Sequence, residues 1–104
     1  MIRHGIDLTS EAIRAFCRKW KIKELAVFGS FLSDDFHKDS DIDFLAEFEE
    51  DEEWDLLDEL RMRDELERIA GRPVDLMCRQ ALASGGNPRF QREVLSTAER
   101  IYAL

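Results

Sequence analysis

Several features that define whole classes of proteins are scarce or missing in this sequence of 104 residues. Its two cysteines, Cys17 and Cys78, are too few for a disulfide-stabilised scaffold, and each stands among apolar neighbours. Its apolar runs are only a few residues long, which excludes a membrane-spanning helix. The first residues, interrupted by Arg3, His4 and Asp7, lack the pattern of a signal peptide. These absences predict a cytoplasmic protein with reduced cysteines and no membrane contact.

Positive charge is also in short supply. Lys and Arg number 15 against 23 Asp and Glu, which gives a formal net charge of −8. Nucleic-acid backbones bind to clustered basic residues, whereas the basic residues of this chain are interspersed with acidic ones. We therefore expect no direct contact with nucleic acid. An acidic surface of this kind is typical of a protein that binds a basic protein partner or simply stays soluble.

The composition that remains is that of one ordinary folded domain. Hydrophobic residues make up 44% of the chain and charged residues 37%, a balance that excludes an intrinsically disordered protein. Domains commonly contain ~100–150 residues, so residues 1–104 are expected to form a single domain. A domain of this size can bury a core without support from disulfides.

The spacing of apolar residues predicts three helices. The first follows Thr9, a residue suited to the N-cap, and carries one apolar stripe formed by Ile13, Phe16, Cys17 and Trp20. The second covers residues 54–69 and is stopped by Gly71 and Pro73. Its apolar stripe consists of Leu56, Leu60, Met62, Leu66 and Ile69.

The third predicted helix covers residues 89–104 and follows a loop at residues 84–88. Its inner side is expected to carry Phe90, Val94 and Leu95.

Three short segments are predicted to be strands, at residues 25–28, 41–48 and 74–78. Because successive side chains of a strand point to opposite faces, Asp41 and Asp43 share the face that their apolar neighbours leave. By the same alternation, Asp75 points away from Val74 and Leu76. The order of helices and strands predicts a small α/β or α+β fold, with a mixed β-sheet and flanking helices.

The paired carboxylates of Asp41 and Asp43 are candidate metal ligands. Two residues apart on a strand, they leave the backbone roughly 6–7 Å apart, so each raises the proton affinity of the other unless a cation joins them. Mg²⁺ typically binds one or two carboxylates together with substrate phosphates. If the strand bearing Asp75 is adjacent, the three carboxylates suit metal-assisted phosphoryl or nucleotidyl transfer.

Gly29 and Ser30 follow directly after the first predicted strand. A glycine at this place lets the backbone approach a phosphate closely, and a serine can add a hydroxyl donor. A Gly-Ser pair alone is typical of any turn, so its meaning depends on its spacing from the aspartates. Ten residues separate Ser30 from Asp41.

That combination resembles the signature of the polymerase-β-like nucleotidyltransferase superfamily. Residues 26–30, Ala-Val-Phe-Gly-Ser, and residues 40–45, Ser-Asp-Ile-Asp-Phe-Leu, are most similar to the minimal nucleotidyltransferases, known as MNT proteins. Residues 72–76, Arg-Pro-Val-Asp-Leu, are similar to the strand of the third carboxylate. The resemblance extends over most of the chain and implies a polymerase-β-like nucleotidyltransferase core.

The resemblance also implies an activity. MNT proteins are often encoded beside HEPN-domain ribonucleases and act as their antitoxins, in some cases by transferring AMP from ATP to a toxin tyrosine. By position, Asp41 and Asp43 would bind Mg²⁺, and Gly29 and Ser30 would hold the triphosphate of ATP. Asp75 would act as a general base or a third metal ligand. The expected partners are therefore a nucleoside triphosphate and a HEPN-type toxin, in a hetero-oligomer.

Three other interpretations compete with the enzyme. A non-catalytic antitoxin of the same fold would neutralise its partner by binding alone, and it is favoured by Phe31-Leu32-Ser33, where many relatives have an arginine or another polar residue. A carboxylate-metal nuclease fits the aspartates but not the net charge of −8. An EF-hand calcium loop fits the acidic spacing, but Phe44 stands where the loop needs glycine.

Overall fold

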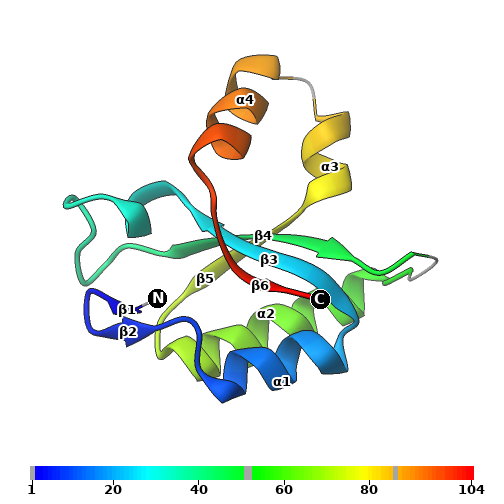
Figure 1. Ribbon diagram of the computed structural model, residues 1–104, viewed down its shortest axis with the longest axis horizontal. Helices are drawn as coiled ribbons and strands as arrows, with labels where there is room; N and C mark the ends of the chain where they lie inside the picture. The colour runs from blue at the N-terminus through cyan, green and yellow to red at the C-terminus, as the bar shows by residue number, and fades with distance from the viewer. Residues whose placement is uncertain (1, 51–52, 86) are drawn as a thin grey trace.

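A four-stranded sheet in the order β5–β4–β3–β6 organises the chain (Figure 1). The computed structural model describes residues 2–50, 53–85 and 87–104. β3 (Ile22–Phe28) pairs antiparallel with β4 (Ile42–Phe48) and with β6 (Glu99–Ala103). β4 pairs in parallel with β5 (Val74–Cys78). The predicted mixed sheet with flanking helices is therefore confirmed, and the three predicted strands all belong to it.

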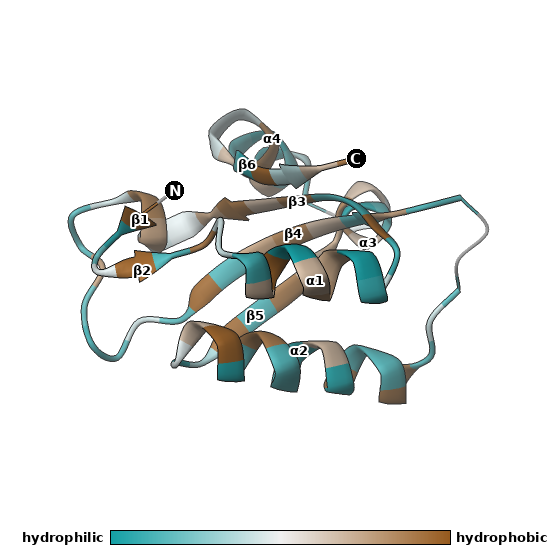
Figure 2. Cartoon of the chain, turned by 60° about the horizontal axis from the view of Figure 1, so that its bottom comes forward, coloured by the Kyte–Doolittle hydropathy of each residue, from teal (hydrophilic) through white to brown (hydrophobic). Residues whose placement is uncertain are grey.

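Two helices cover one face of this sheet, α1 (Glu11–Lys19) and α2 (Leu56–Ala70). Figure 2 shows them side by side on one face of the strands, each with hydrophobic and hydrophilic residues in alternation. The main core lies between these layers and includes Ile42, Phe44 and Ala46 of β4, each fully buried. The alternation of side chains along β4 is thus as predicted, and it leaves Asp43 on the opposite face.

The apolar stripe predicted for α1 is confirmed. Its four members, Ile13, Phe16, Cys17 and Trp20, are buried in the main core. The predicted N-cap is wrong by one residue, because Ser10 takes that position. Thr9 instead closes a turn, in which its amide and its hydroxyl both donate to Asp7 Oδ1.

The second helix was predicted over residues 54–69, and α2 occupies Leu56–Ala70. Asp55 caps it, since its carboxylate accepts from the Asp58 amide while the Asp58 side chain accepts from the Asp55 amide. Gly71 ends it in the left-handed conformation. The predicted stripe is only partly right. Met62 and Leu66 are buried, whereas Leu56 and Leu60 are 71% and 44% exposed.

Because α2 has one buried and one exposed face, alanine substitutions of leucines on the two faces should differ in their effect on stability. The variant Leu66→Ala is expected to lower the free energy of unfolding by about 2–5 kcal/mol, because it leaves a cavity beneath the sheet. The variant Leu56→Ala should change it by less than about 0.5 kcal/mol, because that side chain is exposed. Chemical denaturation of both variants measures the two values. A similar loss for both would contradict the observed orientation of α2.

The third predicted helix, over residues 89–104, is wrong in its second half. The chain forms α3 (Arg79–Ser84) and α4 (Pro88–Thr97), and then turns into the strand β6. Ala98, with ψ of 135°, breaks the helix, and the residues after it pair with the open edge of β3. On α4, Val94 is buried, but Phe90 and Leu95 are 41% and 50% exposed. Gly86, in the predicted loop, lies outside the described residues.

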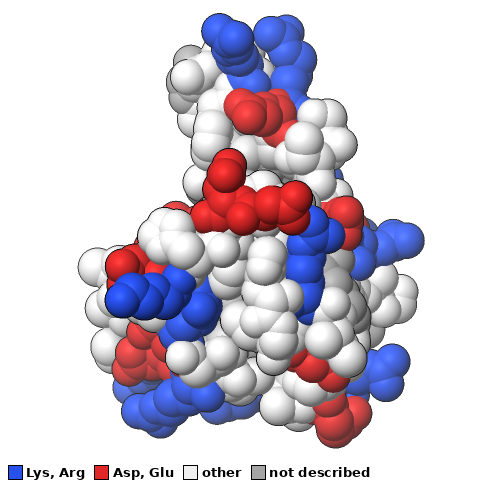
Figure 3. All heavy atoms as spheres, turned by 90° about the vertical axis from the view of Figure 1, so that its left-hand side faces the viewer, with Lys and Arg blue, Asp and Glu red and all other residues white. Residues whose placement is uncertain are grey.

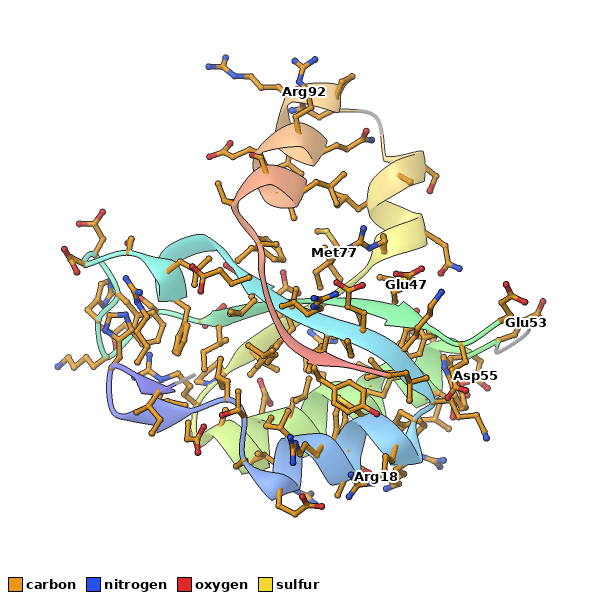
Figure 4. The ribbon with its side chains drawn as sticks, viewed as in Figure 1. Arg18, Glu47, Glu53, Asp55, Met77 and Arg92 are labelled. Carbon is orange, nitrogen blue, oxygen red and sulfur yellow. The ribbon has the colours of Figure 1, made fainter. Side chains whose placement is uncertain are left out.

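Helices α3 and α4 form an arm on the face of the sheet opposite α1 and α2 (Figure 1). A second, smaller core joins this arm to the strands, through Ala26, Phe28, Leu45, Leu82 and Val94. Arg79 adds ionic contacts, 3.9 Å to Glu24 and 3.7 Å to Glu47. Figure 4 shows Glu47 and Met77 on the side of the sheet that faces α3.

One further element differs from the prediction. A short hairpin of β1 (Ile2–Arg3) and β2 (Ile6–Asp7) precedes α1, where the sequence predicts no strand. A 3₁₀ helix η1 (Gly29–Leu32) follows β3, in agreement with the short helical turn that the sequence allows from Ser30 onward. Among the described residues, no helix has both the length and the apolar character that a membrane crossing requires.

Candidate active site

The parallel pairing of β4 and β5 places two of the three predicted carboxylates side by side. Asp43 is the register partner of Asp75, so both side chains leave the same face of neighbouring strands that are about 4.8 Å apart. The third, Asp41, lies just before β4. The amide of the next residue, Ile42, donates to the carbonyl of Pro73 at 3.1 Å, which ties this end of β4 to the start of β5.

The three carboxylates affect one another electrostatically. The pKa of Asp43 is raised above its usual value, first by burial and then by the negative charges of Asp75 and Asp41. Among the described residues, none donates a hydrogen bond or forms an ion pair with any of the three carboxylates. The site is therefore an anionic cluster whose charge the described side chains do not compensate.

Gly29 brings the predicted phosphate-binding turn against this cluster. Its φ of +73° is in the left-handed region, which glycine adopts without strain. A Cβ atom at Gly29 would lie closer than 3.0 Å to Asp43 Oδ2, so the absence of a side chain here makes room for the carboxylate. Ser30 follows in η1 and is half-buried. The structure thus brings Gly29 and Asp43 into direct contact, as the predicted site requires.

The residues after the Gly-Ser pair have a structural role. Phe31 is fully buried in the main core, where its ring meets those of His4 and Phe36 edge-on at 5.4 Å and 5.2 Å. The apolar residue at this position therefore fills the core rather than facing the nucleotide site. This position lacks the arginine or other polar residue that many relatives have, but the buried Phe31 does not obstruct the carboxylates.

The aspartates fit a magnesium ion that arrives with a nucleotide. Within the described parts of the chain, no three carboxylate, imidazole or thiol groups already converge as a complete ligand set. Mg²⁺ commonly takes one or two carboxylates and completes its shell with water and substrate phosphates. Asp41 and Asp43 supply that number. Burial, and after it the repulsion from Asp75 and Asp41, raises the pKa of Asp43, and a bound cation would offset both effects.

A cleft of about 400 Å³ opens beside the edge strand β5. Its lining is mixed, with apolar side chains such as Phe48, Met62 and Leu76 and polar or charged ones that are Glu59, Arg63, Asp75 and Gln80. The indole Nε1 of Trp54, also in the wall, is buried and has no hydrogen-bond partner among the residues that the structure describes. A cleft that combines apolar side chains with a carboxylate in its wall suits an aromatic group that carries a hydroxyl.

Charge is distributed unevenly around this end of the sheet. Figure 3 shows acidic side chains gathered in a band where the α3–α4 arm leaves the sheet, with basic side chains at the outer end of the arm. Figure 4 identifies Arg92 at that outer end. Because the band is negative, a nucleotide triphosphate can approach it only with a neutralising cation.

Two arginines and a histidine near the site were not anticipated from the sequence. Arg72 Nη1 donates to the carbonyls of His37 and Ser40, at 3.0 Å and 2.9 Å. Arg3 Nη2 donates to the carbonyl of Leu32 at 2.8 Å, and His4 Nε2 lies 2.9 Å from the carbonyl of Phe31. Their acceptors are main-chain carbonyls from distant segments, so no local motif signals these contacts.

Comparisons with known proteins bear on the family and the fold of this chain. The nucleotidyltransferase domain family matches residues 9–101. The protein adenylyltransferase MntA of Thermococcus cleftensis is 35% identical over 77 residues, which cover 74% of this chain and 76% of that protein. A toxin–antitoxin crystal structure with AMP-PNP gives a TM-score of 0.69 at 20% identity, covering 90% of this chain and 73% of that chain.

A third similarity is to a complex of a tri-AMPylated Shewanella oneidensis HEPN toxin with an MNT antitoxin. One chain of that complex gives a TM-score of 0.63 at 19% identity, and the match covers 93% of this chain and 71% of that chain. At these identities the two solved structures bear on the fold alone.

Proposed function

This chain belongs to the nucleotidyltransferase domain family, and we propose that it transfers AMP from ATP to a tyrosine hydroxyl of a HEPN-type toxin, as the antitoxin of that toxin. One observation carries the proposal: Asp43 and Asp75 are register partners on neighbouring strands, and Asp43 lies directly against the turn at Gly29. A single domain over residues 1–104 would contain the whole site.

The nucleotide would bind at the junction of β3 and β4. Asp41 and Asp43 would hold Mg²⁺, which supplies charge neutralisation at the phosphates when it is bound. The Asp43 carboxylate occupies the space that a side chain at Gly29 would need, so the triphosphate would lie against the main chain of this turn beside that carboxylate. The Ser30 hydroxyl could donate to a phosphate oxygen. The position of Gly29 against Asp43 supports a site in which the phosphates and the carboxylates are within reach of each other.

Asp75 would act on the acceptor. In the transfer step, a bond forms between the acceptor oxygen and the α-phosphorus of ATP, and the bond to the bridging oxygen of pyrophosphate breaks. The proton of the acceptor hydroxyl passes to the Asp75 carboxylate, which acts as the general base. The cleft beside β5, which Asp75 helps to line, is large enough for an aromatic side chain and would admit the acceptor hydroxyl beside this residue.

We assign the protein to the cytoplasm, where thiols remain reduced. The free cysteines Cys17 and Cys78 support this assignment. Burial raises the pKa of the Cys17 thiol to about 12, so this residue is an inert core side chain.

Incubation with labelled ATP, Mg²⁺ and the neighbour-encoded toxin tests the proposal. We expect covalent label on the toxin, no label when the metal is chelated, and loss of label when the acceptor tyrosine of the toxin is changed to phenylalanine. A toxin that is bound and silenced without acquiring label would establish the non-catalytic antitoxin instead. Label that persists without a divalent cation would contradict the role of the aspartates.

A further inference from the structure

Asp41 is the least constrained of the three aspartates. It precedes the first residue of β4, so the sheet holds it from one side, through the amide of Ile42, which donates to the Pro73 carbonyl. It is reached through the segment of residues 33–41, which has no helix or strand of its own. A metal ligand must nevertheless be held within about 0.5 Å of its productive position, so some other contact has to fix this segment.

That contact comes from Arg72. Its Nη1 atom bridges two carbonyls of the segment, His37 at 3.0 Å and Ser40 at 2.9 Å. Ser40 is the residue immediately before Asp41, so one of these bonds fixes the peptide group that carries the aspartate. A planar guanidinium can hold two carbonyls at fixed angles, which a single ammonium group does less well.

Phe36 completes the attachment. Its ring lies under the guanidinium of Arg72, with 4.3 Å between Cζ and the ring centroid, and it stacks against His4 at 4.5 Å. The ring also meets the buried Phe31 edge-on. The middle of the segment is therefore anchored to the core, and Arg72 joins this anchor to the carbonyl next to Asp41.

We propose that Arg72 is a positioning residue for the metal site, which sets Asp41 relative to Asp75. This inference rests on the proposed function, because it assigns Arg72 a role in metal–nucleotide binding. Arg72 stands three residues before Asp75 on the same segment, directly after the left-handed Gly71 that ends α2. Arg72 therefore connects the strand β5, which carries Asp75, to the loop that carries Asp41.

The direction in which metal affinity changes when Arg72 is removed distinguishes a positioning role from a purely electrostatic one. If Arg72 acted only as a positive charge near three carboxylates, its removal would strengthen the binding of a divalent cation. If it positions Asp41, its removal weakens that binding. Groups that orient metal ligands typically account for about 10–100-fold in metal affinity, so the weakening should be easy to measure.

The test uses the variant Arg72→Ala in two assays. Mn²⁺ binding in the presence of a non-hydrolysable ATP analogue is followed by electron paramagnetic resonance, and the Mg²⁺ concentration for half-maximal transfer is measured with the toxin. We expect both the Kd for Mn²⁺ and this Mg²⁺ concentration to rise about tenfold or more, with the rate at saturating Mg²⁺ changed much less. Arg72→Lys, which keeps the charge and one donor, should recover part of the loss.

Arg14→Ala is the matched control, because it removes the same charge from the exposed surface of α1. It should leave both values unchanged. If Arg72→Ala does not fold, Phe36→Leu removes the platform while retaining Arg72, and a smaller shift in the same direction is expected. Unchanged or tighter Mn²⁺ binding in the folded variants would overturn the inference. If the wild type binds Mn²⁺ and the analogue but transfers no AMP, the proposed function fails and the binding assay still decides the role of Arg72.

Discussion

The double variant Asp41→Asn/Asp43→Asn is expected to lose AMP transfer by roughly 1,000-fold or more, because metal-assisted charge stabilisation contributes several kcal/mol to such reactions. Asparagine has nearly the same shape as aspartate, so the packing of β4 should be preserved. The amide oxygens that remain are weak ligands for a hard cation and carry no charge to hold it. Initial rates with labelled ATP and the toxin, across a range of Mg²⁺ concentrations, measure the loss.

The control for this variant removes the same charge nearby. Asp34 and Asp35 are exposed residues of the segment that leads to Asp41, and neither is a candidate metal ligand. The variant Asp34→Asn/Asp35→Asn makes the same change in net charge. Transfer by this control should stay within about threefold of the wild type, as is usual for surface positions away from a site. Equal losses in both double variants would mean that general electrostatics, and not metal binding, explains the result.

The same double variant, although it loses AMP transfer, is expected to be at least as stable as the wild type. The folded protein raises the pKa of Asp43, so the ionised carboxylate opposes folding at neutral pH. In the wild type this penalty is present above the raised pKa and is relieved as the pH falls through it towards 3.8. The double variant Asp41→Asn/Asp43→Asn has no ionisable group at position 43 and therefore lacks this penalty at every pH. Its melting temperature at pH 7 should therefore equal or exceed that of the wild type, which also excludes unfolding as the cause of inactivity.

The second large effect is expected from Gly29→Ala. An alanine at φ of +73° costs about 1–2 kcal/mol in backbone strain. Its Cβ atom would also fall closer than 3.0 Å to Asp43 Oδ2, so the carboxylate must turn away from its present position. Misplacement of a catalytic group by about 1 Å can cost about 100-fold in rate, and we expect a loss of that order in AMP transfer.

The variant Gly5→Ala is the control that distinguishes the effect of backbone strain from the effect of displacing the Asp43 carboxylate. Gly5 has a φ of +77°, but a Cβ atom there would have no neighbour within 4 Å. This variant should show a comparable backbone penalty in thermal unfolding and keep transfer within about twofold of the wild type. If Gly29→Ala retained full activity at a temperature at which it is folded, the contact between Gly29 and Asp43 would have no functional meaning.

The parts of the site that follow from local alternation could be predicted from the sequence. A strand places every second side chain on one face, so the alternation alone assigns Asp43 to the face opposite Phe44. The pairing of Asp43 with Asp75 was only a conditional expectation. It depends on β4 and β5 being neighbours, and that follows from the packing of α2 across the sheet.

Other features depend on contacts that the local sequence does not record. Residues 99–103 are compatible with a continued helix, and they form β6 because β3 offers an unpaired edge. Leu56 and Leu60 fit the apolar spacing of α2, yet only the position of the sheet decides that they point outward. The role of Arg72 was hidden for a similar reason, since its partners are main-chain carbonyls on a distant loop.

The connections within the sheet have a consequence for the order of folding. β3, β4 and β5 follow one another along the chain, and the loop after β3 and the helix α2 are enough to bring Gly29, Asp43 and Asp75 together. By contrast, Val27 pairs with Glu99 of β6, which requires closure of a much longer loop. Because loop closure costs entropy that grows with length, the β3–β4–β5 unit should assemble first. The carboxylate cluster would then take shape in a partly folded chain, before β6 completes the sheet.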